Sequence, residues 1–163
     1  MKKQIVILNG TGGSGKDTFI NLCKKYCSLS SISSVDKVKI AAEYLGWSGT
    51  KTDKDRKFLS DLKDLSTNYN DLPFNDIIKK IDEFNNDNNQ ILFVKLREPG
   101  EIKKLASLYE VKTALIRRKD GKIITSNRAD ALIESYNYDY VIVNGKLDEF
   151  EEEARKFVEE ILK

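Results

Sequence analysis

Two kinds of hydrophobic pattern alternate along the chain. Short, nearly unbroken apolar runs are typical of strands buried on both faces, and they occupy residues 4–9, 91–96, 112–116 and 140–143, with a weaker, serine-rich run at 29–33. Between these runs, apolar residues at helical spacing predict helices near residues 16–27, 34–45, 55–69, 74–85, 101–109 and 147–162. Ser34 is expected to cap the second helix, and Gly46 to end it.

This alternation predicts an α/β fold. Strands that alternate with helices form a parallel sheet wrapped by helices, and ligands bind at the carboxyl ends of such strands. The pattern shows no internal repeat and no linker, so we expect a single domain over residues 1–163.

Composition then narrows the classes of function. The net charge is +2, from 28 basic and 26 acidic residues, which gives no indication of nucleic-acid binding. No apolar stretch approaches the roughly 18 residues of a membrane span. The apolar run that follows Lys2 and Lys3 is too short for a signal peptide and suits a first strand. We therefore expect a cytoplasmic protein with no membrane partner.

Two residue types limit the available chemistry. The chain has no histidine, which removes the commonest general base and the commonest zinc ligand. Its two cysteines, Cys23 and Cys27, lie four residues apart in a predicted helix. Without further ligands or a CxxC spacing, we expect them to act as small buried hydrophobic groups.

The strongest local signal lies between the first strand and the first helix, where the sequence matches the pattern GxxxxGK. Glycines let successive backbone N–H groups turn toward phosphate oxygens. The helix N-terminus offers unpaired donors, and the lysine adds a mobile positive charge. We therefore predict a nucleotide-phosphate site formed by Gly10, Gly12, Gly13, Ser14, Gly15 and Lys16.

The residue after this lysine departs from the usual loop. A Ser or Thr normally follows and binds Mg²⁺, whereas here Asp17 follows and Thr18 comes one position later. Asp17 can bind Mg²⁺ directly or through a water, Thr18 can make that contact, or Asp17 can simply favour the helix N-terminus. A carboxylate beside a triphosphate is repulsive without a cation between them, which favours the magnesium role.

The sequence SGKDT at residues 14–18 resembles the phage-type deoxynucleoside monophosphate kinases, and also the animal-type phosphomevalonate kinases. Weaker similarity covers nearly the whole chain, at residues 34–37, 56–65, 91–118 and 138–150. The resemblance implies a P-loop kinase fold with a five-stranded parallel sheet. It also implies acceptor-binding helices at about 34–86, a basic lid at about 118–130, and ATP and Mg²⁺ as cofactors.

The same resemblance implies roles for residues outside the loop. Four residues correspond to the acceptor side: Asp36, Lys37, Arg56 and Arg97. Asn144 and Gly145 correspond to the place of the donor base.

One position departs from the family. Lys95 stands two residues before Arg97, where members tend to have Asp. Glu98, Asp17 and Asp36 are the acidic residues that could substitute for it in the magnesium shell or in activating the acceptor.

Phosphoryl transfer also needs cations that converge on the transferring group. Planar guanidinium groups suit phosphate, so we expect catalytic roles for Lys16, Arg97, Arg117 and Arg128, and a nucleotide contact for Arg118. Each of these arginines, taken alone, can instead be a solvated surface charge.

These observations favour an ATP- and Mg²⁺-dependent kinase of a nucleoside or deoxynucleoside monophosphate. One alternative is a kinase of another phosphorylated metabolite, similar to phosphomevalonate or dephospho-coenzyme A kinases. Lys95 motivates a second alternative, a nucleotide-binding regulator with little transfer activity. The expected partner is a small phosphate acceptor, and the sequence leaves the oligomeric state open.

Overall fold

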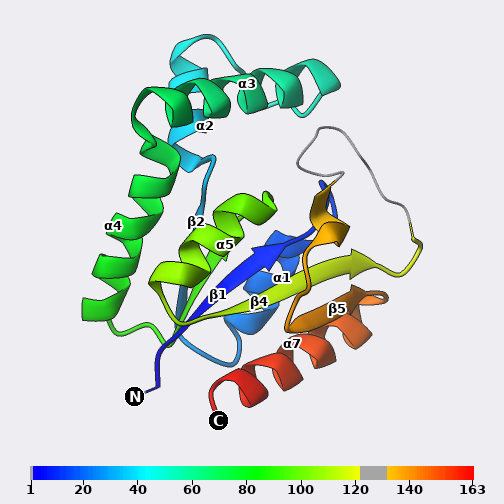
Figure 1. The fold of residues 1–163 in the computed structure, drawn as a ribbon. Helices are drawn as coiled ribbons and strands as arrows, with labels where there is room; N and C mark the ends of the chain where they lie inside the picture. Colours follow the sequence, from blue (N-terminus) through cyan, green and yellow to red (C-terminus); the bar gives the residue numbers. More distant parts are fainter. Residues whose placement is uncertain (1, 122–131) are drawn as a thin grey trace.

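The computed structural model describes residues 2–121 and 132–163. Figure 1 shows strands and helices that alternate through most of the chain. The strands are β1 (Gln4–Asn9), β2 (Leu29–Ser33), β3 (Ile91–Lys95), β4 (Val111–Arg118) and β5 (Tyr140–Asn144). The helical elements are α1 (Lys16–Cys23), α2 (Asp36–Tyr44), α3 (Asp53–Asn70), α4 (Leu72–Asn86), α5 (Pro99–Leu108), the short 3₁₀ helix η1 (Ile133–Ser135) and α7 (Leu147–Ile161). None of the helices in the described part of the chain has both the length and the apolar character needed to cross a membrane.

The five strands form one sheet in the order β2-β3-β1-β4-β5, and every neighbouring pair is parallel. β1 is therefore central, and the loop that follows it lies at the middle of the carboxyl edge. In the register, Leu8 stands opposite Lys95 on β3, and Asn9 stands opposite Leu115 on β4. This pairing places the end of β3 directly beside the start of the glycine-rich loop.

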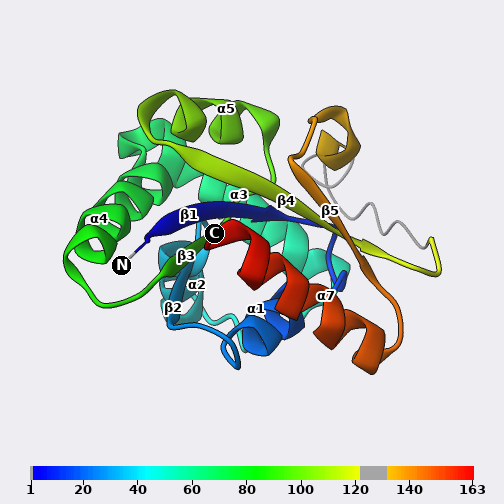
Figure 2. The same cartoon turned by 90° about the horizontal axis from the view of Figure 1, so that it is seen from below.

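Alternating residues of the strands build a core on each face of the sheet. In Figure 2, α1 and α7 cover one face, and α4 and α5 cover the other. On β1, Val6 and Leu8 pack in the first core, and Ile5 and Ile7 pack in the second. Because both faces of β1 are buried, its sequence is almost wholly apolar, as expected for a central parallel strand.

The helices α2 and α3 lie beyond the carboxyl ends of the strands (Figure 1). α3 begins two residues earlier than the sequence predicts. Thr52 and Asp55 form a capping box there, in which each side chain accepts from the other's backbone N–H. α2 begins two residues later than predicted, with Val35 at the N-cap position, so Ser34 does not cap this helix.

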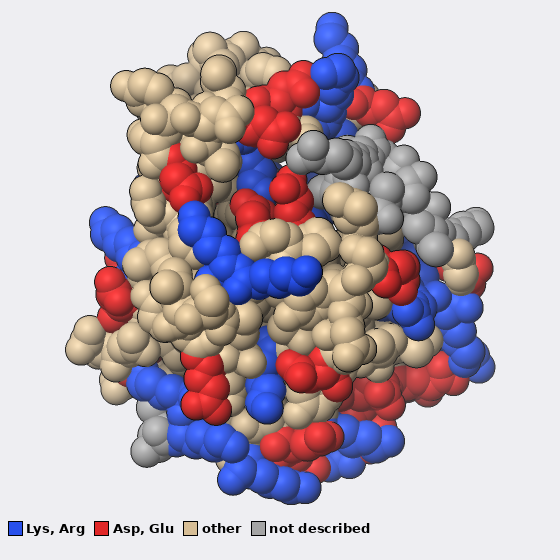
Figure 3. Space-filling model, viewed as in Figure 1, with Lys and Arg blue, Asp and Glu red and all other residues tan. Residues whose placement is uncertain are grey.

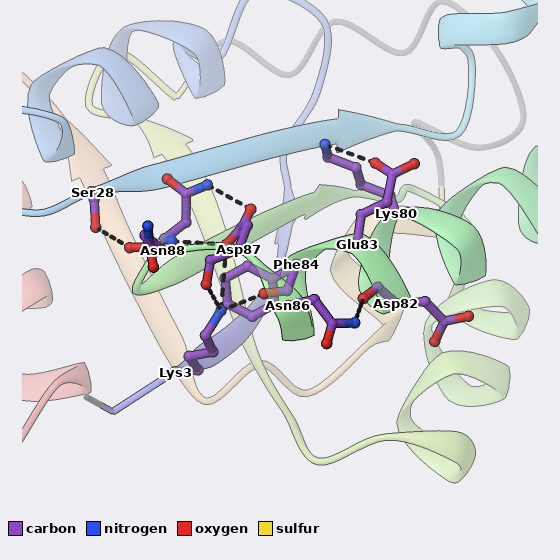
Figure 4. A network of polar contacts seen from close by, with 10 residues as sticks. Lys3, Ser28, Lys80, Asp82, Glu83, Phe84, Asn86, Asp87 and Asn88 are labelled. Carbon is purple, nitrogen blue, oxygen red and sulfur yellow. Dashed lines mark hydrogen bonds and ion pairs between the residues drawn. The ribbon is translucent and has the colours of Figure 1, made fainter.

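The opposite end of the molecule is held by a polar network around Lys3, shown in Figure 4. The Lys3 ammonium donates to the backbone carbonyls of Phe84 and Asp87 and pairs with the Asp87 carboxylate. It also lies 4.6 Å from the centroid of the Phe84 ring. These contacts join the start of β1 to the end of α4, far from the carboxyl edge of the sheet.

Candidate functional site

The segment between β1 and α1 has the backbone of a phosphate-binding loop. Gly10, Gly13 and Gly15 have φ values of +150°, +75° and +102°, which glycine adopts far more readily than other residues. Gly15 is the N-cap residue of α1, and no side chain caps this helix. The first N–H groups of α1 are therefore available to an anion at the loop.

Lys16 folds back over this loop. Its ammonium donates to the carbonyl oxygen of Gly10 at 2.5 Å and to that of Thr11 at 3.0 Å. A phosphate oxygen is a charged acceptor and forms a stronger hydrogen bond than a backbone carbonyl. The lysine is thus placed to exchange these carbonyls for the phosphates of a nucleotide.

A buried asparagine joins the loop to neighbouring segments. Asn9 is fully buried at the end of β1, and its carbonyl oxygen accepts from the N–H of Gly10 at 2.8 Å. Its amide group donates to the hydroxyl of Tyr138 at 2.7 Å and to the backbone carbonyl of Arg97 at 3.1 Å. One side chain therefore fixes both the first residue of the loop and the backbone at Arg97.

A second asparagine holds the loop from β5. The amide nitrogen of Asn144 donates to the carbonyl oxygen of Ser14 at 2.9 Å. It packs so closely that a Cβ atom at Gly15 would lie 2.3 Å from the same nitrogen. The sequence predicts a donor-base role for Asn144 and Gly145, and the structure places the Asn144 side chain on the loop itself.

Asp17 and Lys95 form an ion pair at the mouth of the site. The Lys95 ammonium donates to the Asp17 carboxylate at 2.9 Å. The Asp17 side chain is 81% exposed, whereas that of Lys95 is 23% exposed. The hydrogen bond from Lys95, assisted by the positive charges of Lys16 and Lys39, holds the pKa of Asp17 below its usual value. Asp17 is therefore ionised at neutral pH and already neutralised by a lysine.

As an ion pair, Asp17 and Lys95 do not provide the usual protein ligands of a Mg²⁺ ion. The usual shell combines a hydroxyl directly after the loop lysine with an acid from a neighbouring strand. Here Asp17 stands directly after the loop lysine, and its carboxylate is paired with Lys95 at the end of β3. Thr18 and Glu98, the other predicted ligands, line the pocket beside the loop.

A pocket of about 480 Å³ opens between the loop, the end of β3 and the helices α2 and α3. Its lining is strongly basic. Among the described residues, seven basic side chains contribute to it: Lys16, Lys39, Lys51, Arg56, Lys63, Lys95 and Arg97. The acidic side chains of that part of the chain that line it are Asp17 and Glu98. Figure 3 shows basic and acidic side chains together in the hollow below α3. Such a lining favours an anionic ligand.

The predicted acceptor residues divide into two groups. Arg56 and Arg97 line the pocket, and the Arg56 guanidinium lies so close to the loop that a Cβ atom at Gly12 would stand 2.9 Å from its Nη1. Asp36 and Lys37 are not among the lining residues.

Both of those α2 residues have other partners. The Asp36 carboxylate accepts from the N–H of Ser33 at 2.8 Å, and the Lys37 ammonium lies 3.8 Å from the carboxylate of Asp76 on α4. Lys39, two residues further along α2, lines the pocket instead. The basic residue that α2 contributes to the pocket is therefore Lys39 rather than Lys37.

Arg117 and Arg118, at the start of the predicted lid, are the last two residues of β4, because pairing with β5 extends that strand as far as Arg118. Arg117 forms a two-pronged pair with Glu134, at 2.6 and 3.2 Å. Arg118 pairs with Asp120 at 2.6 Å and also reaches the carbonyl of Gly13 at 3.5 Å. Arg128 and most of the lid at 118–130 lie outside the described residues.

Several site residues are not predicted by the sequence analysis. In the sequence, three of these residues have the pattern of surface charges on helices or loops: Lys39, Lys51 and Lys63. They line one pocket only because α2 and α3 fold over the end of the sheet. The role of Asn9 could be predicted from the sequence, because a polar residue at the end of an otherwise apolar buried strand needs a hydrogen-bond partner.

No protein-family model matches the chain, and no curated protein matches it either. Solved structures do resemble it. TT1252 from Thermus thermophilus has 14% sequence identity and a TM-score of 0.59, with all of both chains covered. A sugar kinase from Janibacter sp. HTCC2649 has 15% identity and a TM-score of 0.54, covering 96% of this chain and 95% of its own. A gluconokinase from Sinorhizobium meliloti 1021 has 14% identity and a TM-score of 0.51, covering 98% and 93%.

At sequence identities this low, the structural similarity establishes a shared fold and nothing more specific. The α/β fold with a five-stranded, all-parallel sheet flanked by helices is confirmed, and it is the fold of P-loop kinases. The similarity gives no support to a nucleoside monophosphate kinase over a kinase with another acceptor.

Proposed function

We propose that this protein transfers the γ-phosphoryl group of ATP to a small anionic acceptor, specifically a nucleoside or deoxynucleoside monophosphate. The observation that carries this proposal is the position of the basic pocket. It begins at the phosphate-binding loop and continues to α2 and α3, so that a donor triphosphate and an acceptor can meet in one enclosure.

The loop supports the donor half of the proposal. It combines left-handed glycines, an uncapped helix N-terminus and Lys16 folded over the hollow. These are the features that bind the phosphates of a nucleotide. Arg118 adds a guanidinium beside the carbonyl of Gly13.

The opposite wall supports the acceptor half. Lys39, Arg56 and Arg97 face the same pocket from α2, from α3 and from the end of β3. In the reaction, an oxygen of the acceptor phosphate attacks the γ-phosphorus of ATP. The bond from that phosphorus to the β–γ bridging oxygen breaks, and ADP leaves with the electron pair. Fixed cations stabilise the charge on the transferring group without reorganising during the step.

A panel of acceptors tests the proposal. Purified protein is incubated with ATP and Mg²⁺ and with each common ribo- or deoxyribonucleoside monophosphate separately, and ADP and product mass are measured. We expect a diphosphate product with one or a few acceptors, and loss of turnover in Lys16→Ala. Lys103→Met is the matched control, because Lys103 is exposed on α5 outside the pocket. Turnover that persists in Lys16→Ala would contradict the assignment of the loop.

A polyhydroxy acid or phosphorylated sugar is the second candidate acceptor. Ser33, Ser34 and Ser60 line the pocket and offer hydroxyl groups to a polyol. Two of the similar structures are named a sugar kinase and a gluconokinase. The same assay with gluconate and with sugar phosphates separates this candidate from the nucleotide, because only one class of acceptor will give a phosphorylated product.

A further inference from the structure

The ion pair between Asp17 and Lys95 brings together two residues that each depart from the usual site. Asp17 stands where P-loop proteins carry a magnesium-binding hydroxyl, and Lys95 lies at the end of a strand beside β1, where an acid would complete the shell. The two replacements are reciprocal, because one introduces a negative charge and the other a positive charge. Their side chains meet at 2.9 Å.

The position of Lys95 brings its side chain to the pocket beside the phosphate-binding loop. It stands opposite Leu8 in the sheet register, one residue before the end of β1, and it lines the same pocket as Lys16. Its side chain is mostly buried, and Asp17 holds its ammonium group at the first turn of α1. Phosphates bound at that helix N-terminus therefore meet two lysine ammonium groups, one from the loop and one from β3.

The charge of Asp17 requires such a cation. A carboxylate at the first turn of α1 repels the triphosphate unless a positive charge lies nearby, although the 81% exposure of the Asp17 side chain lets water screen part of this repulsion. The ammonium of Lys95 already provides that charge. A divalent ion placed at Asp17 would share the carboxylate with this ammonium and would be repelled by its positive charge.

We propose that Lys95, paired with Asp17, takes the place beside the nucleotide phosphates that a protein-bound Mg²⁺ ion takes in other P-loop sites, because it cancels the Asp17 charge that would otherwise repel them and donates to the phosphates with its remaining N–H groups. The inference rests on the proposed function, since it assumes that ATP binds at the loop. Its consequence is that this protein binds ATP without Mg²⁺.

Calorimetric titration of ATP, with excess Mg²⁺ and with excess EDTA, tests the inference. For the wild type, the dissociation constant stays within about threefold between the two conditions. Lys95→Met weakens binding in EDTA by about tenfold or more, the loss expected for one charged hydrogen bond. Mg²⁺ then restores part of the affinity, because Asp17 is left without a partner.

Two further variants separate this role from a merely structural one. Asp17→Asn keeps Lys95 in the pocket and removes the negative charge, so ATP affinity in EDTA is equal or tighter. The double variant Asp17→Ser with Lys95→Asp recreates the usual magnesium shell, and its binding becomes at least about tenfold tighter with Mg²⁺ than in EDTA. Thermal unfolding of each variant and of the Lys103→Met control verifies that the proteins are folded.

The outcomes are distinct. Wild-type protein that binds ATP only with Mg²⁺ overturns the inference and leaves the proposed kinase activity standing. Lys95→Met that binds as the wild type does in EDTA overturns it as well, as does a tenfold loss in Asp17→Asn. An absence of ATP binding in both conditions overturns the proposed function together with the inference.

Discussion

The amide group of Asn144 donates to the carbonyl oxygen of Ser14 at 2.9 Å, across 130 residues of sequence. β5 is an edge strand of the sheet, so this hydrogen bond ties the edge to the central phosphate-binding loop. It fixes a carbonyl that would otherwise be free to turn toward the phosphates and repel them. The loop is thereby held with its N–H groups available to an anion.

Replacing Asn144 should therefore weaken nucleotide binding. We expect Asn144→Ala to raise the dissociation constant for ATP by about three- to tenfold, which corresponds to the typical net value of one hydrogen bond. Asn144→Asp should cost more, because a carboxylate would face the Ser14 carbonyl without a donor. Titration calorimetry measures both variants. Asn86→Ala is the control, because Asn86 donates to the carbonyl of Asp82 at the far end of α4 (Figure 4).

Glycine is required at position 15 for two separate reasons. Its φ of +102° is strained for any other residue, and an added Cβ atom would lie 2.3 Å from the amide nitrogen of Asn144. Gly15→Ala should lower the free energy of unfolding by about 1–3 kcal/mol and abolish measurable ATP binding.

Gly100 provides a matched contrast in an exposed turn of α5. Its φ lies outside the left-handed region, and an added Cβ atom would meet nothing within 4 Å. Gly100→Ala should raise the free energy of unfolding by about 0.4–1 kcal/mol and leave ATP affinity unchanged. Urea denaturation followed by circular dichroism measures both variants. Equal effects of the two substitutions would contradict this account of Gly15.

A partly buried ion pair anchors α3 to α5 at the wall of the pocket. The Lys63 ammonium lies 2.8 Å from the Glu101 carboxylate, and the two side chains are only 11% and 18% exposed. Glu101→Gln should lower the free energy of unfolding by about 1–3 kcal/mol, less than for a fully buried pair, because some water reaches both groups.

The pairing itself is tested by a double-mutant cycle. Lys63→Met combined with Glu101→Leu removes both charges, so the double variant should be more stable than the sum of the single effects predicts. Urea denaturation of the wild type and the three variants gives the coupling. Lys57 and Asp61 form an exposed pair on the same helix and serve as a control, whose coupling should be about 0.5 kcal/mol or less. Additive effects at Lys63 and Glu101 would contradict the assigned anchor.

The parts of the molecule that the sequence predicts are those set by local patterns. Buried parallel strands are continuous apolar runs and the loop is a contiguous motif, so both are visible without a structure. The pairing of Asp17 with Lys95 is not local. It depends on β3 lying beside β1, and a sheet order of 2-3-1-4-5 cannot be read from the strands one by one. Charge repulsion alone predicts a cation beside Asp17, and the structure places the Lys95 ammonium there rather than leaving the position to Mg²⁺.

The cysteines give a prediction for alkaline pH. Burial raises the pKa of Cys27 to about 11 from its usual 9.0, and burial also raises that of Cys23. In the unfolded chain both thiols lose their protons near pH 9, before the folded protein does. The unfolded state is therefore favoured progressively as the pH rises from about 9 toward 11, while the thiols contribute their full stability below pH 9.

Cys27→Ala isolates part of this effect. Cys27 is half-buried, and its thiol donates weakly to the carbonyl of Cys23 at 3.6 Å, so the small alanine side chain should be tolerated there. We expect the free energy of unfolding to fall less steeply between about pH 8 and about pH 10.5 in this variant than in the wild type. Urea denaturation with a reducing agent present measures both slopes. Burial also raises the pKa of Tyr138, to about 12, and this contribution is common to both proteins and cancels in the comparison. Identical slopes would show that the Cys27 thiol does not titrate differently in the folded and unfolded states.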